Sequence, residues 1–353
     1  MNKFTHLIDL DDFPIEYIKK IVKSGADIAL NTDEYSECCK GKVLATLFYE
    51  PSTRTQMSFQ TAMLRLGGTL IGFDNPETSS VAKGENLKDT TKVVSSYADI
   101  MVMRNPVEGS AKAAALSSDC PIINAGDGGH LHPTQTLTDL LTIKLAHGQL
   151  ENLTIGVCGD LKYGRTTHSL CKTLSKFSGN KFIFISAPEL SMPDYIKDIV
   201  KANGCEFEEI YSLEDALPKL DMLYMTRIQR ERFAGKSDAA IDKYILTKDM
   251  LRLMRPDAII LHPLPRVDEI EIAVDDDPRA KYFLQAKYGV YVRMALIIEV
   301  LKNENPVKLF HEEHSDIICK NEKCVTRKEK YLPHSFRRKG DMLFCDYCEA
   351  AQP

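Results

Sequence analysis

Residues 42–55, KVLATLFYEPSTRT, decide the fold class of this chain. The first eight residues form an apolar run that predicts a buried strand. Ser52 and Thr53 are residue types that cap helices, and apolar side chains then recur at helical spacing until Gly67 and Gly68 end the helix. Those apolar residues are Phe59, Met63 and Leu66. A strand that passes directly into a helix predicts an α/β fold.

The same alternation continues along the chain. Further strands are predicted at 70–73, 100–103, 153–160, 181–186, 222–225 and 258–261, and long helices at 134–147 and 290–301. This order predicts the fold class α/β, with two doubly wound parallel-sheet domains. The helix at 134–147 is expected to connect the domains. Residues 303–306 break the last helix and mark a linker to a small C-terminal module.

Composition narrows the class of protein. With 353 residues, 44% hydrophobic and 27% charged, the chain has room for two core domains and a small extra module. Its net charge of -5 argues against general nucleic-acid binding. The N-terminus, MNKFTHLIDLDDF, has early acidic residues and no long apolar core, so no signal peptide is expected. No apolar run is long enough to span a bilayer. We therefore expect a cytoplasmic enzyme.

The turn after the first strand carries the strongest binding signal. Ser52, Thr53, Arg54 and Thr55 surround a predicted helix N-terminus. Free backbone N–H groups, hydroxyls and a guanidinium together match a phosphate dianion. Taken alone, this stretch is explained equally well as an ordinary capped helix with a surface arginine.

Four other polar segments lie just after a predicted strand or just before a helix, where ligands bind in open α/β sheets. They are HPTQ at 132–135, DLKYGRT at 160–166, YMTRIQ at 224–229 and HPLPRVDEI at 262–270. The stretch 156–164 lacks the G-x-G-x-x-G spacing of dinucleotide sites. The set therefore favours an anion-binding enzyme other than a dinucleotide-dependent one.

In this order, these segments resemble the catalytic chain of the aspartate carbamoyltransferase family, from the N-terminus to about Leu301. The resemblance implies carbamoyl transfer from carbamoyl phosphate to L-aspartate, giving N-carbamoyl-L-aspartate and phosphate early in pyrimidine (UMP) biosynthesis. It implies a carbamoyl-phosphate-binding domain at 1–132, on which the helix at 288–303 packs, an aspartate-binding domain at 133–287, and a homotrimer with shared active sites. Ornithine carbamoyltransferases, the sister family and the main alternative, typically have His-Cys-Leu-Pro where this chain has HPLP at 262–265.

The resemblance also implies roles for single residues. The phosphate would be held by Ser52, Thr53, Arg54, Thr55 and Arg104, and the carbamoyl oxygen would lie against Thr55, Arg104 and His132. The carbamoyl amino group would be bound by Gln135 and the backbone carbonyls of Leu264 and Pro265, with a cis peptide bond between the last two. The implied catalytic residues are Arg54, Thr55, Lys83, Arg104, His132 and Gln135.

Aspartate would be bound by a second polar set. The resemblance implies that its carboxylates meet Arg165, Thr166, Arg227 and Gln229, and that a neighbouring subunit inserts Ser79 and Lys83. A phosphate and two carboxylates in one cleft require many cations, and arginine suits them because its planar fork grips both groups. Alone, each arginine would more often be a solvated surface group. No cofactor is expected at this site, so much of the acceleration should come from holding both reactants together.

Two positions depart from the family pattern. The family commonly has arginine after Ser-Thr-Arg-Thr and glutamate four residues later, whereas this chain has Gln56 and Gln60. The two lie one helical turn apart, so a neutral pair would replace an ion pair. We expect little effect on catalysis. A more than tenfold gain in turnover from Gln56→Arg alone would contradict this.

Four cysteines near the C-terminus have metal-ligand spacing. Cys319 and Cys324 form one close pair, and Cys345 and Cys348 follow twenty residues later. Such pairs suit a tetrahedral Zn²⁺ with four thiolates, although iron can occupy similar sites. A redox pair or incidental cysteines are the alternatives. The module at 306–353 is too short for its own hydrophobic core, so a metal would be needed to fold it.

The module resembles the zinc domain of the regulatory chain of bacterial aspartate carbamoyltransferases, including Ser335, Phe336 and the basic residues 337–339. The nucleotide-binding domain of that chain has no room here, so we expect little or no feedback control by nucleotides within this polypeptide. Two roles remain open for the module: a clamp that joins trimers or neighbouring chains into a higher assembly, and a small binding module, for example for nucleic acid, since 320–339 is locally basic. A non-catalytic scaffold is the alternative for the whole chain.

Overall fold

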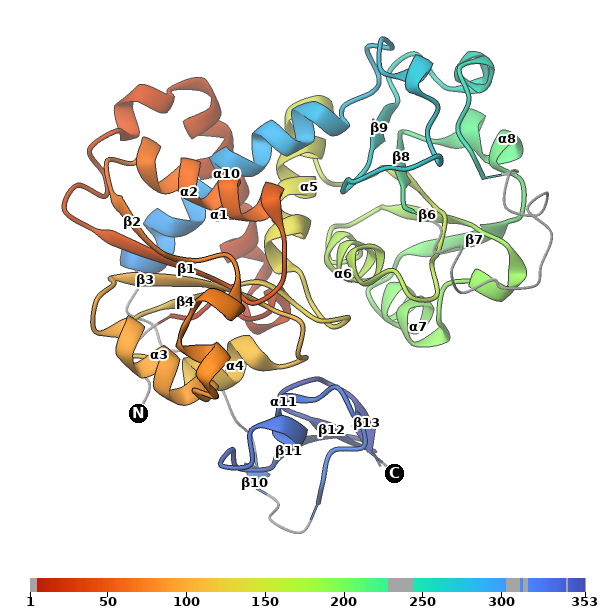
Figure 1. Ribbon diagram of the computed structural model, residues 1–353. Coiled ribbons are helices and arrows are strands. Elements are labelled where there is room, and N and C mark those ends of the chain that lie inside the picture. Colours follow the sequence, from red (N-terminus) through yellow and green to blue (C-terminus); the bar gives the residue numbers. More distant parts are fainter. Residues whose placement is uncertain (1–4, 228–243, 303–311, 314–316, 341, 353) are drawn as a thin grey trace. The chain divides into compact units, whose positions relative to one another are not determined.

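The computed structural model describes residues 5–227, 244–302, 312–313, 317–340 and 342–352. The chain forms two compact units (Figure 1). The N-terminal unit comprises residues 1–134 and 290–353, and the central unit comprises residues 135–289. The chain passes from one unit to the other within α5 (Pro133–His147) and returns within α10 (Tyr282–Lys302). The predicted connecting helix at 134–147 is thus confirmed, and the last helix begins earlier than its predicted start at 290.

The N-terminal unit is built on a four-stranded parallel sheet in the order β2-β1-β3-β4. Figure 1 shows α1, α2 and α10 on one face of this sheet and α3 and α4 on the other. The strands are β1 (Val43–Phe48), β2 (Thr69–Phe73), β3 (Ile100–Asn105) and β4 (Ile122–Asp127). The helices are α1 (Ile15–Leu30), α2 (Thr53–Arg65), α3 (Leu87–Ser95) and α4 (Ser110–Ala115), with short 3-10 helices η1 (Leu10–Asp12), η2 (Thr32–Tyr35), η3 (Pro76–Thr78) and η4 (Ser80–Lys83).

The central unit contains a five-stranded parallel sheet in the order β7-β6-β5-β8-β9. Its strands are β5 (Thr154–Cys158), β6 (Lys181–Ile185), β7 (Glu206–Ile210), β8 (Met222–Met225) and β9 (Ile259–Leu261). Its helices are α6 (Arg165–Leu174), α7 (Asp194–Ala202) and α8 (Leu213–Ala216), with 3-10 helices η5 (Pro188–Leu190), η6 (Leu217–Lys219), η8 (Asp249–Leu253) and η9 (Ile272–Val274).

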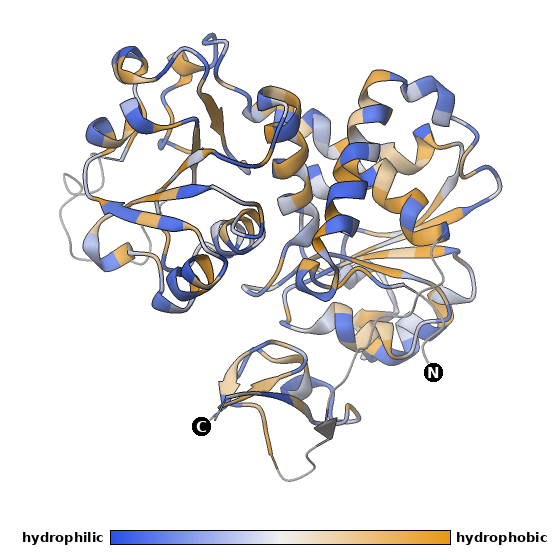
Figure 2. Ribbon diagram, turned by 180° about the vertical axis from the view of Figure 1, so that it is seen from behind, coloured by the Kyte–Doolittle hydropathy of each residue, from blue (hydrophilic) through white to orange (hydrophobic). Residues whose placement is uncertain are grey.

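Apolar side chains hold both parallel sheets together. The inner strands β1, β3, β5 and β8 are almost fully buried. This explains their unbroken apolar sequences, because a parallel sheet is covered by helices on both faces. In Figure 2 the hydrophobic colour is concentrated on the strands of the N-terminal sheet and on parts of the helices. The two parallel-sheet domains of the predicted fold class are confirmed.

Two strands of the parallel sheets were not expected from the sequence. β4 has only two branched apolar residues, Ile122 and Ile123, before the polar and small residues that follow. β7 has the sequence EFEEI and is the edge strand of its sheet, with no fully buried residue. Strands of these two kinds lack the apolar run by which the inner strands are recognised.

The C-terminal module is a small antiparallel sheet in the order β10-β11-β12-β13, with one helical turn, α11 (Val325–Lys328). Its strands are β10 (Glu312–Glu313), β11 (Ser335–Lys339), β12 (Met342–Cys345) and β13 (Ala351–Gln352). Among the described residues of the chain, no helix is both long enough and apolar enough to cross a membrane.

Candidate active site and metal centre

The proposed phosphate-binding residues lie at the carboxyl edge of the N-terminal sheet. Ser52 is the N-cap residue of α2, although its side chain makes no capping hydrogen bond, and Thr53, Arg54 and Thr55 form the first turn. β1 leads into this turn, and β2 and β3 lie on opposite sides of β1. Ligands bind α/β sheets at such a switch point. Thr55 is buried and Arg54 is exposed, so the turn can offer hydroxyl, guanidinium and backbone N–H groups to an anion.

Arg104 lies near the carboxyl end of β3, beside β1. Its Nη2 pairs with Oε1 of Glu50 at 2.7 Å, and its Nη1 donates to the carbonyl of Ala125 at 3.3 Å. Only 12% of the side chain is exposed. The buried Nε makes no hydrogen bond within the described part of the chain. Arg104 is therefore fixed in position and retains a donor for a ligand.

The electrostatics of this region favour an anion. Partial loss of solvent around its guanidinium lowers the pKa of Arg54, and the nearby charge of Arg104 lowers it further. Burial also lowers the pKa of Arg104, which Glu50 partly restores. Glu50 pairs with Arg104, and the positive charge of the neighbouring Arg54 adds to that of Arg104, which suits a phosphate.

His132 directly precedes α5 and is 6% exposed. It lies close to Arg104 at Gly126, whose backbone has a φ of +120°. A Cβ atom at Gly126 would lie 2.9 Å from Nη1 of Arg104 and 3.6 Å from Cδ2 of His132. Only glycine fits this conformation and this space. The structure therefore brings Arg104 and His132 together.

A charged cluster fixes the segment that leads into His132. Asp127 accepts from the backbone N–H of Leu131 at 3.0 Å and from that of Gly109 at 2.8 Å, and its Oδ2 lies 3.0 Å from Nδ1 of His130. Glu349 of the C-terminal module lies 3.6 Å from Nε2 of His130. Burial by itself lowers the pKa of His130, but Asp127 and Glu349 together raise it to about 10. His130 is thus a buried cation between two carboxylates.

Ser79 and Lys83 lie elsewhere in the N-terminal unit. Ser79 caps η4: its Oγ accepts from the N–H of Val81 at 3.3 Å and donates to the carbonyl of Pro76 at 2.8 Å. Lys83 is exposed at the end of η4.

The proposed aspartate-binding residues follow adjacent strands of the central sheet. Arg165 and Thr166 begin α6 after β5, and Arg227 is an exposed residue two positions after β8. β6 and β8 lie on opposite sides of β5, so these residues also stand at a switch point. Gln229 lies outside the described residues.

Leu264 and Pro265 follow β9, the neighbour of β8. The peptide bond between them is cis, which confirms the prediction. Leu264 has a φ of +55°, an unfavourable value for a branched side chain. Its N–H donates to Nδ1 of His262 at 2.8 Å, and Nε2 of His262 lies 2.8 Å from Oε1 of Glu269. The histidine therefore holds this turn in its conformation.

Gln135 lies in the first turn of α5 and donates from Nε2 to Oδ1 of Asp139 at 2.8 Å. Sequence reasoning missed Asp139, and also Glu50, the partner of Arg104. Both could have been noticed, since Glu50 lies inside the FYEPSTRT segment and Asp139 lies one helical turn after Gln135. Spacing alone does not reveal that Asp139 is completely buried.

Gln56 and Gln60, which depart from the family pattern, face a cavity beside β1 and β2. Nε2 of Gln60 lies 3.5 Å from Oγ1 of Thr46, a weak hydrogen bond. The cavity has a volume of about 310 Å³ and its lining is Thr46, Gln56, Gln60, Leu70, Ile71, Gly72, Phe73 and Asp74. The neutral pair is thus accommodated in an open, partly polar space.

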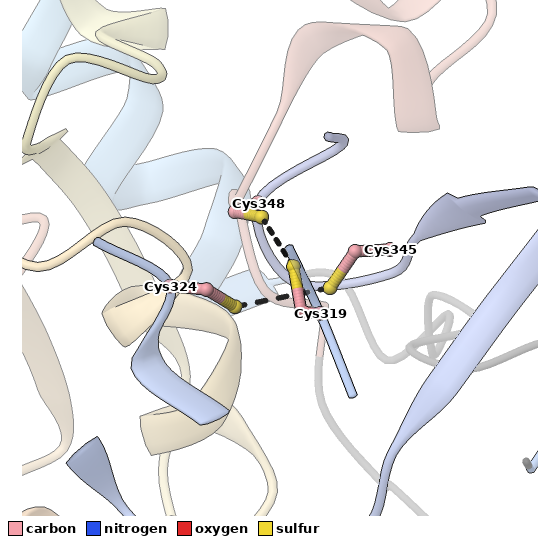
Figure 3. Close-up of side chains that lie close together, drawn as sticks. All are labelled: Cys319, Cys324, Cys345 and Cys348. Atoms are coloured by element: carbon pink, nitrogen blue, oxygen red, sulfur yellow. Dashed lines mark hydrogen bonds between the residues drawn. The ribbon is translucent and has the colours of Figure 1, made fainter. Parts of the chain in front are cut away.

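The four C-terminal cysteines gather into one buried cluster, with their sulfur atoms turned toward one another (Figure 3). All four Sγ atoms lie within 4.8 Å of one another. The Sγ atoms of Cys319 and Cys348 are 3.6 Å apart, and those of Cys324 and Cys345 are 3.8 Å apart. Four thiolates at about 2.3 Å from a tetrahedral Zn²⁺ would be about 3.8 Å apart. The geometry of this cluster therefore fits a tetrahedral metal ion.

Electrostatics within the cluster lead to the same conclusion. Hydrogen bonds from neighbouring thiols lower the pKa of Cys324, whereas the crowded neighbours raise the pKa values of Cys345 and Cys348. The four thiols cannot all ionise side by side without a cation. A bound divalent metal ion would remove this conflict, because it stabilises every thiolate at once.

The module docks on the N-terminal unit of its own chain. The backbone N–H of Glu108 donates to the carbonyl of Lys323 at 3.1 Å, and the N–H of Val325 donates to the carbonyl of Glu108 at 2.8 Å. The Glu108 side chain accepts from Nδ2 of Asn321 at 2.5 Å. Gly109 leaves space for Tyr347, whose Cβ would lie only 2.6 Å from an added Cβ. The cysteine cluster and the α4 segment thus share one hydrophobic core.

Family models match nearly the whole chain. Residues 5–145 match the carbamoyl-phosphate binding domain of aspartate/ornithine carbamoyltransferase, and residues 151–300 match the aspartate/ornithine binding domain of the same family. Residues 314–352 match the metal binding domain of the aspartate carbamoyltransferase regulatory chain.

Individual relatives agree with these matches. The aspartate carbamoyltransferase catalytic subunit of Clostridium botulinum is 56% identical over 304 residues, which cover 85% of this chain and 99% of the relative. The catalytic subunit of M. jannaschii aspartate transcarbamoylase has a TM-score of 0.80 at 46% identity, covering 86% of this chain and 98% of the other. The Trypanosoma cruzi enzyme in complex with carbamoyl phosphate and aspartate has a TM-score of 0.77 at 35% identity, covering 85% and 97%.

Proposed function

The chain belongs to the aspartate carbamoyltransferase family, and from that premise we propose which of its residues carry out the reaction. The reaction is the transfer of the carbamoyl group from carbamoyl phosphate to L-aspartate, an early step of pyrimidine biosynthesis. We propose residues 1–132, with the helix at 288–303, as the carbamoyl-phosphate domain, 133–287 as the aspartate domain and 306–353 as a zinc domain.

The observation that carries this proposal is the meeting of Arg104 and His132 at Gly126. Phosphate is bound by Ser52, Thr53, Arg54, Thr55 and Arg104. The α2 N-terminus supplies backbone N–H groups, and the free Nε of Arg104 supplies a further donor. The carbamoyl oxygen lies against Thr55, Arg104 and His132, while Gln135 and the carbonyls of Leu264 and Pro265 bind the amino group.

Attack by the neutral amine of aspartate builds negative charge on the carbamoyl oxygen. Arg104 and His132 donate hydrogen bonds to this oxygen, and such preorganised donors are each worth about 3–4 kcal/mol. The departing phosphate is basic enough to take the amine proton. Arg165, Thr166, Arg227 and Gln229 bind the carboxylates of aspartate, so the two reactants are held together for direct transfer.

We propose further that the chain forms a homotrimer in which a neighbouring subunit supplies Ser79 and Lys83. The exposure of Lys83 at the end of η4 supports this, because an exposed side chain is available to a neighbouring subunit. The test is to mix Lys83→Ala and Arg104→Ala trimers after gentle dissociation. Shared sites predict that a fraction of the activity returns, since some mixed sites contain both native residues. No recovery in mixed trimers would contradict the proposal.

Acceptor choice is tested directly with the purified chain. We expect rapid carbamoylation of L-aspartate, measured as N-carbamoyl-aspartate, and no turnover of L-ornithine beyond background. Preference for ornithine would contradict the assignment of Arg165, Arg227 and the HPLP turn at 262–265 to aspartate binding.

The metal bound by the four cysteines is proposed to be a structural Zn²⁺. The thiolate set and the sulfur separations support it. Elemental analysis should find about one zinc per chain, and iron in its place would contradict the assignment. We propose a cytoplasmic location, because the cysteines are unpaired and a reducing compartment keeps thiols in that state.

The module is proposed to act as a docking clamp. It already covers the Glu108 segment of its own chain, and one of its basic residues, Arg337, is engaged by Glu349. Any higher assembly would use the remaining surface of the module. Size measurement with and without a zinc chelator tests this. A change in nucleic-acid affinity with no change in size would favour the binding-module alternative.

A further inference from the structure

Asp139 is a fully buried carboxylate in the middle of α5 that the reaction as described does not use. Side chains from separate parts of the central unit donate to it. Nε2 of Gln135 lies 2.8 Å from Oδ1, Nε2 of Gln285 lies 2.6 Å from Oδ1, and the Tyr224 hydroxyl lies 2.9 Å from Oδ2. A buried charge is costly unless it is well hydrogen-bonded, so a site of this kind needs an explanation.

The first consequence concerns the orientation of Gln135. An ionised carboxylate can only accept hydrogen bonds, so the amide of Gln135 must turn its N–H₂ group toward Asp139. The carbonyl oxygen of Gln135 then points away from Asp139. An amide whose orientation is left open could offer either a donor or an acceptor to a ligand. Here Asp139 makes Gln135 an acceptor.

The second consequence runs through Gln285. Because its N–H₂ group also faces Asp139, its Oε1 is free to accept from the backbone N–H of His262, at 3.0 Å. Nδ1 of His262 in turn accepts from the N–H of Leu264 at 2.8 Å, which leaves Nε2 to donate to Glu269. Leu264 is the residue with a φ of +55°, so this bond restrains an unfavourable backbone conformation.

We propose that Asp139 is the positioning residue for both amino-binding elements: it makes Gln135 an acceptor and, through Gln285 and His262, orients the carbonyls of the Leu264–Pro265 turn toward the carbamoyl amino group. This rests on the proposed function, in which these elements bind that group. Its consequence is substrate selection. Acetyl phosphate has nearly the shape of carbamoyl phosphate but carries a methyl group in place of the amino group. A site of aligned acceptors discriminates strongly against an analogue that lacks the donor.

The readout is a ratio, kcat/KM with carbamoyl phosphate divided by kcat/KM with acetyl phosphate, both with saturating aspartate and the full-length holoprotein. We expect Asp139→Ala to lower this ratio at least about tenfold, the loss for one misaligned hydrogen bond to the amino group. A purely structural role would lower both rates by the same factor and leave the ratio unchanged. That result would overturn the proposal.

Asp139→Asn serves as the conservative variant. Its Oδ1 can still accept from Gln135 and Gln285, while its Nδ2 can donate to the oxygen of Tyr224. We expect its ratio to return to within about threefold of the wild-type value, since the acceptor oxygen is kept. A ratio as low as that of Asp139→Ala would show that charge, rather than acceptor geometry, matters, and would overturn the proposal.

Tyr224→Phe is the matched control, because it removes a donor to the same carboxylate on the side away from the amides. Its ratio should match wild type. If Asp139→Ala does not fold, as judged by circular dichroism, Gln285→Leu replaces it. That variant cuts only the branch to His262 and should lower the ratio about threefold or more. An unchanged ratio in folded Gln285→Leu would overturn the proposal.

Gln135→Ala separates this proposal from the assigned substrate contacts. If Gln135 binds the amino group, this variant lowers the ratio whatever Asp139 does. An unchanged ratio in Gln135→Ala would mean that the contact itself is wrongly assigned. A lowered ratio in Gln135→Ala with an unchanged ratio in Asp139→Ala would refute only the positioning role.

Discussion

Arg104 in the N-terminal unit and Asp139 in the central unit are both buried, charged side chains, and they differ in how their hydrogen bonds are used. Arg104 has one carboxylate partner, Glu50, and a buried Nε that bonds to nothing within the described residues. Asp139 accepts from Gln135, Gln285 and Tyr224. Arg104 therefore keeps a donor with which it can bind a ligand, whereas Asp139 is hydrogen-bonded by side chains of its own unit.

The difference suggests two ways of contributing to one active site. A donor kept in reserve binds the ligand itself, so its removal should weaken catalysis with every acyl phosphate. A carboxylate engaged by neighbouring side chains acts by fixing the orientation of those neighbours. Its removal should therefore change which substrate is preferred more than how strongly phosphate is bound.

The largest effect is expected at Arg104. Arg104→Ala removes a donor to both the phosphate and the carbamoyl oxygen, so we predict a fall in kcat/KM of at least about 10²-fold. The fall should be equal for carbamoyl phosphate and acetyl phosphate. Arg104→Lys keeps the charge but loses the planar fork, so its kcat/KM should lie between those of the wild type and Arg104→Ala. Retention of more than about a third of the wild-type kcat/KM in Arg104→Ala would contradict this part of the comparison.

Metal removal should affect the N-terminal unit alone. Chelation should unfold the module, since a domain of this size depends on its metal. In hydrogen exchange we expect protection to be lost at 317–352 and at Glu108, whose backbone bonds to Lys323 and Val325. Strands of the central unit, such as β8 and β9, should keep their protection. Unchanged exchange in a sample shown to be free of metal would contradict the prediction.

A smaller effect is expected at Glu269, at the far end of the Asp139 network (Gln135, Asp139, Gln285, His262 and Glu269). Its Oε2 accepts from the backbone N–H groups of Val267 and Asp268, at 3.0 and 3.1 Å. In Glu269→Gln an N–H₂ group replaces one carboxylate oxygen. This group would lie against a donor that the oxygen now accepts from, which should loosen the turn. We predict a two- to fivefold fall in the carbamoyl-to-acetyl ratio, about the effect of one weakened neutral hydrogen bond. A larger fall in this ratio than in Asp139→Ala would contradict the prediction that Asp139 has the greater influence on substrate choice.

A separate effect, on stability rather than on substrate choice, is expected from pH at the cluster of Asp127, His130 and Glu349. The pKa of His130 is raised to about 10 in the folded chain, above its ordinary value of 6.5. The protonated form is thus favoured by folding, and its stabilisation is complete below pH 6.5 and is lost as pH rises toward 10. Urea unfolding between pH 7 and 10 should show the N-terminal unit losing stability. His130→Gln should flatten that slope, and an equal slope in both proteins would contradict the assignment.

The residues of the proposed active site could be named from the sequence because they occupy short segments next to apolar strands. The FYEPSTRT segment, HPTQ at 132–135 and the HPLP turn each follow or precede an element whose periodicity is clear. The four cysteines were predictable for a similar reason, since metal ligands recur at fixed spacing. In each case the sequence signal and the chemistry lie within a few residues.

Other features depend on contacts between distant segments and could not be predicted in this way. Asp139 and Gln285 are 146 positions apart, and nothing near either residue indicates the other. Docking of the module on Glu108 of the same chain was also not anticipated. The sequence of the module does not reveal whether its docking surface contacts its own chain or a separate one. The edge strand β7 was missed because its exposed positions are polar.

The most direct test of the contrast between the two regions is the carbamoyl-to-acetyl phosphate ratio measured side by side in Arg54→Ala and Asp139→Ala. We predict that Arg54→Ala lowers kcat/KM for both substrates by the same factor, so that its ratio stays at the wild-type value. Asp139→Ala should lower the ratio at least about tenfold. A ratio that falls in Arg54→Ala and stays constant in Asp139→Ala would contradict the division of roles between the two regions.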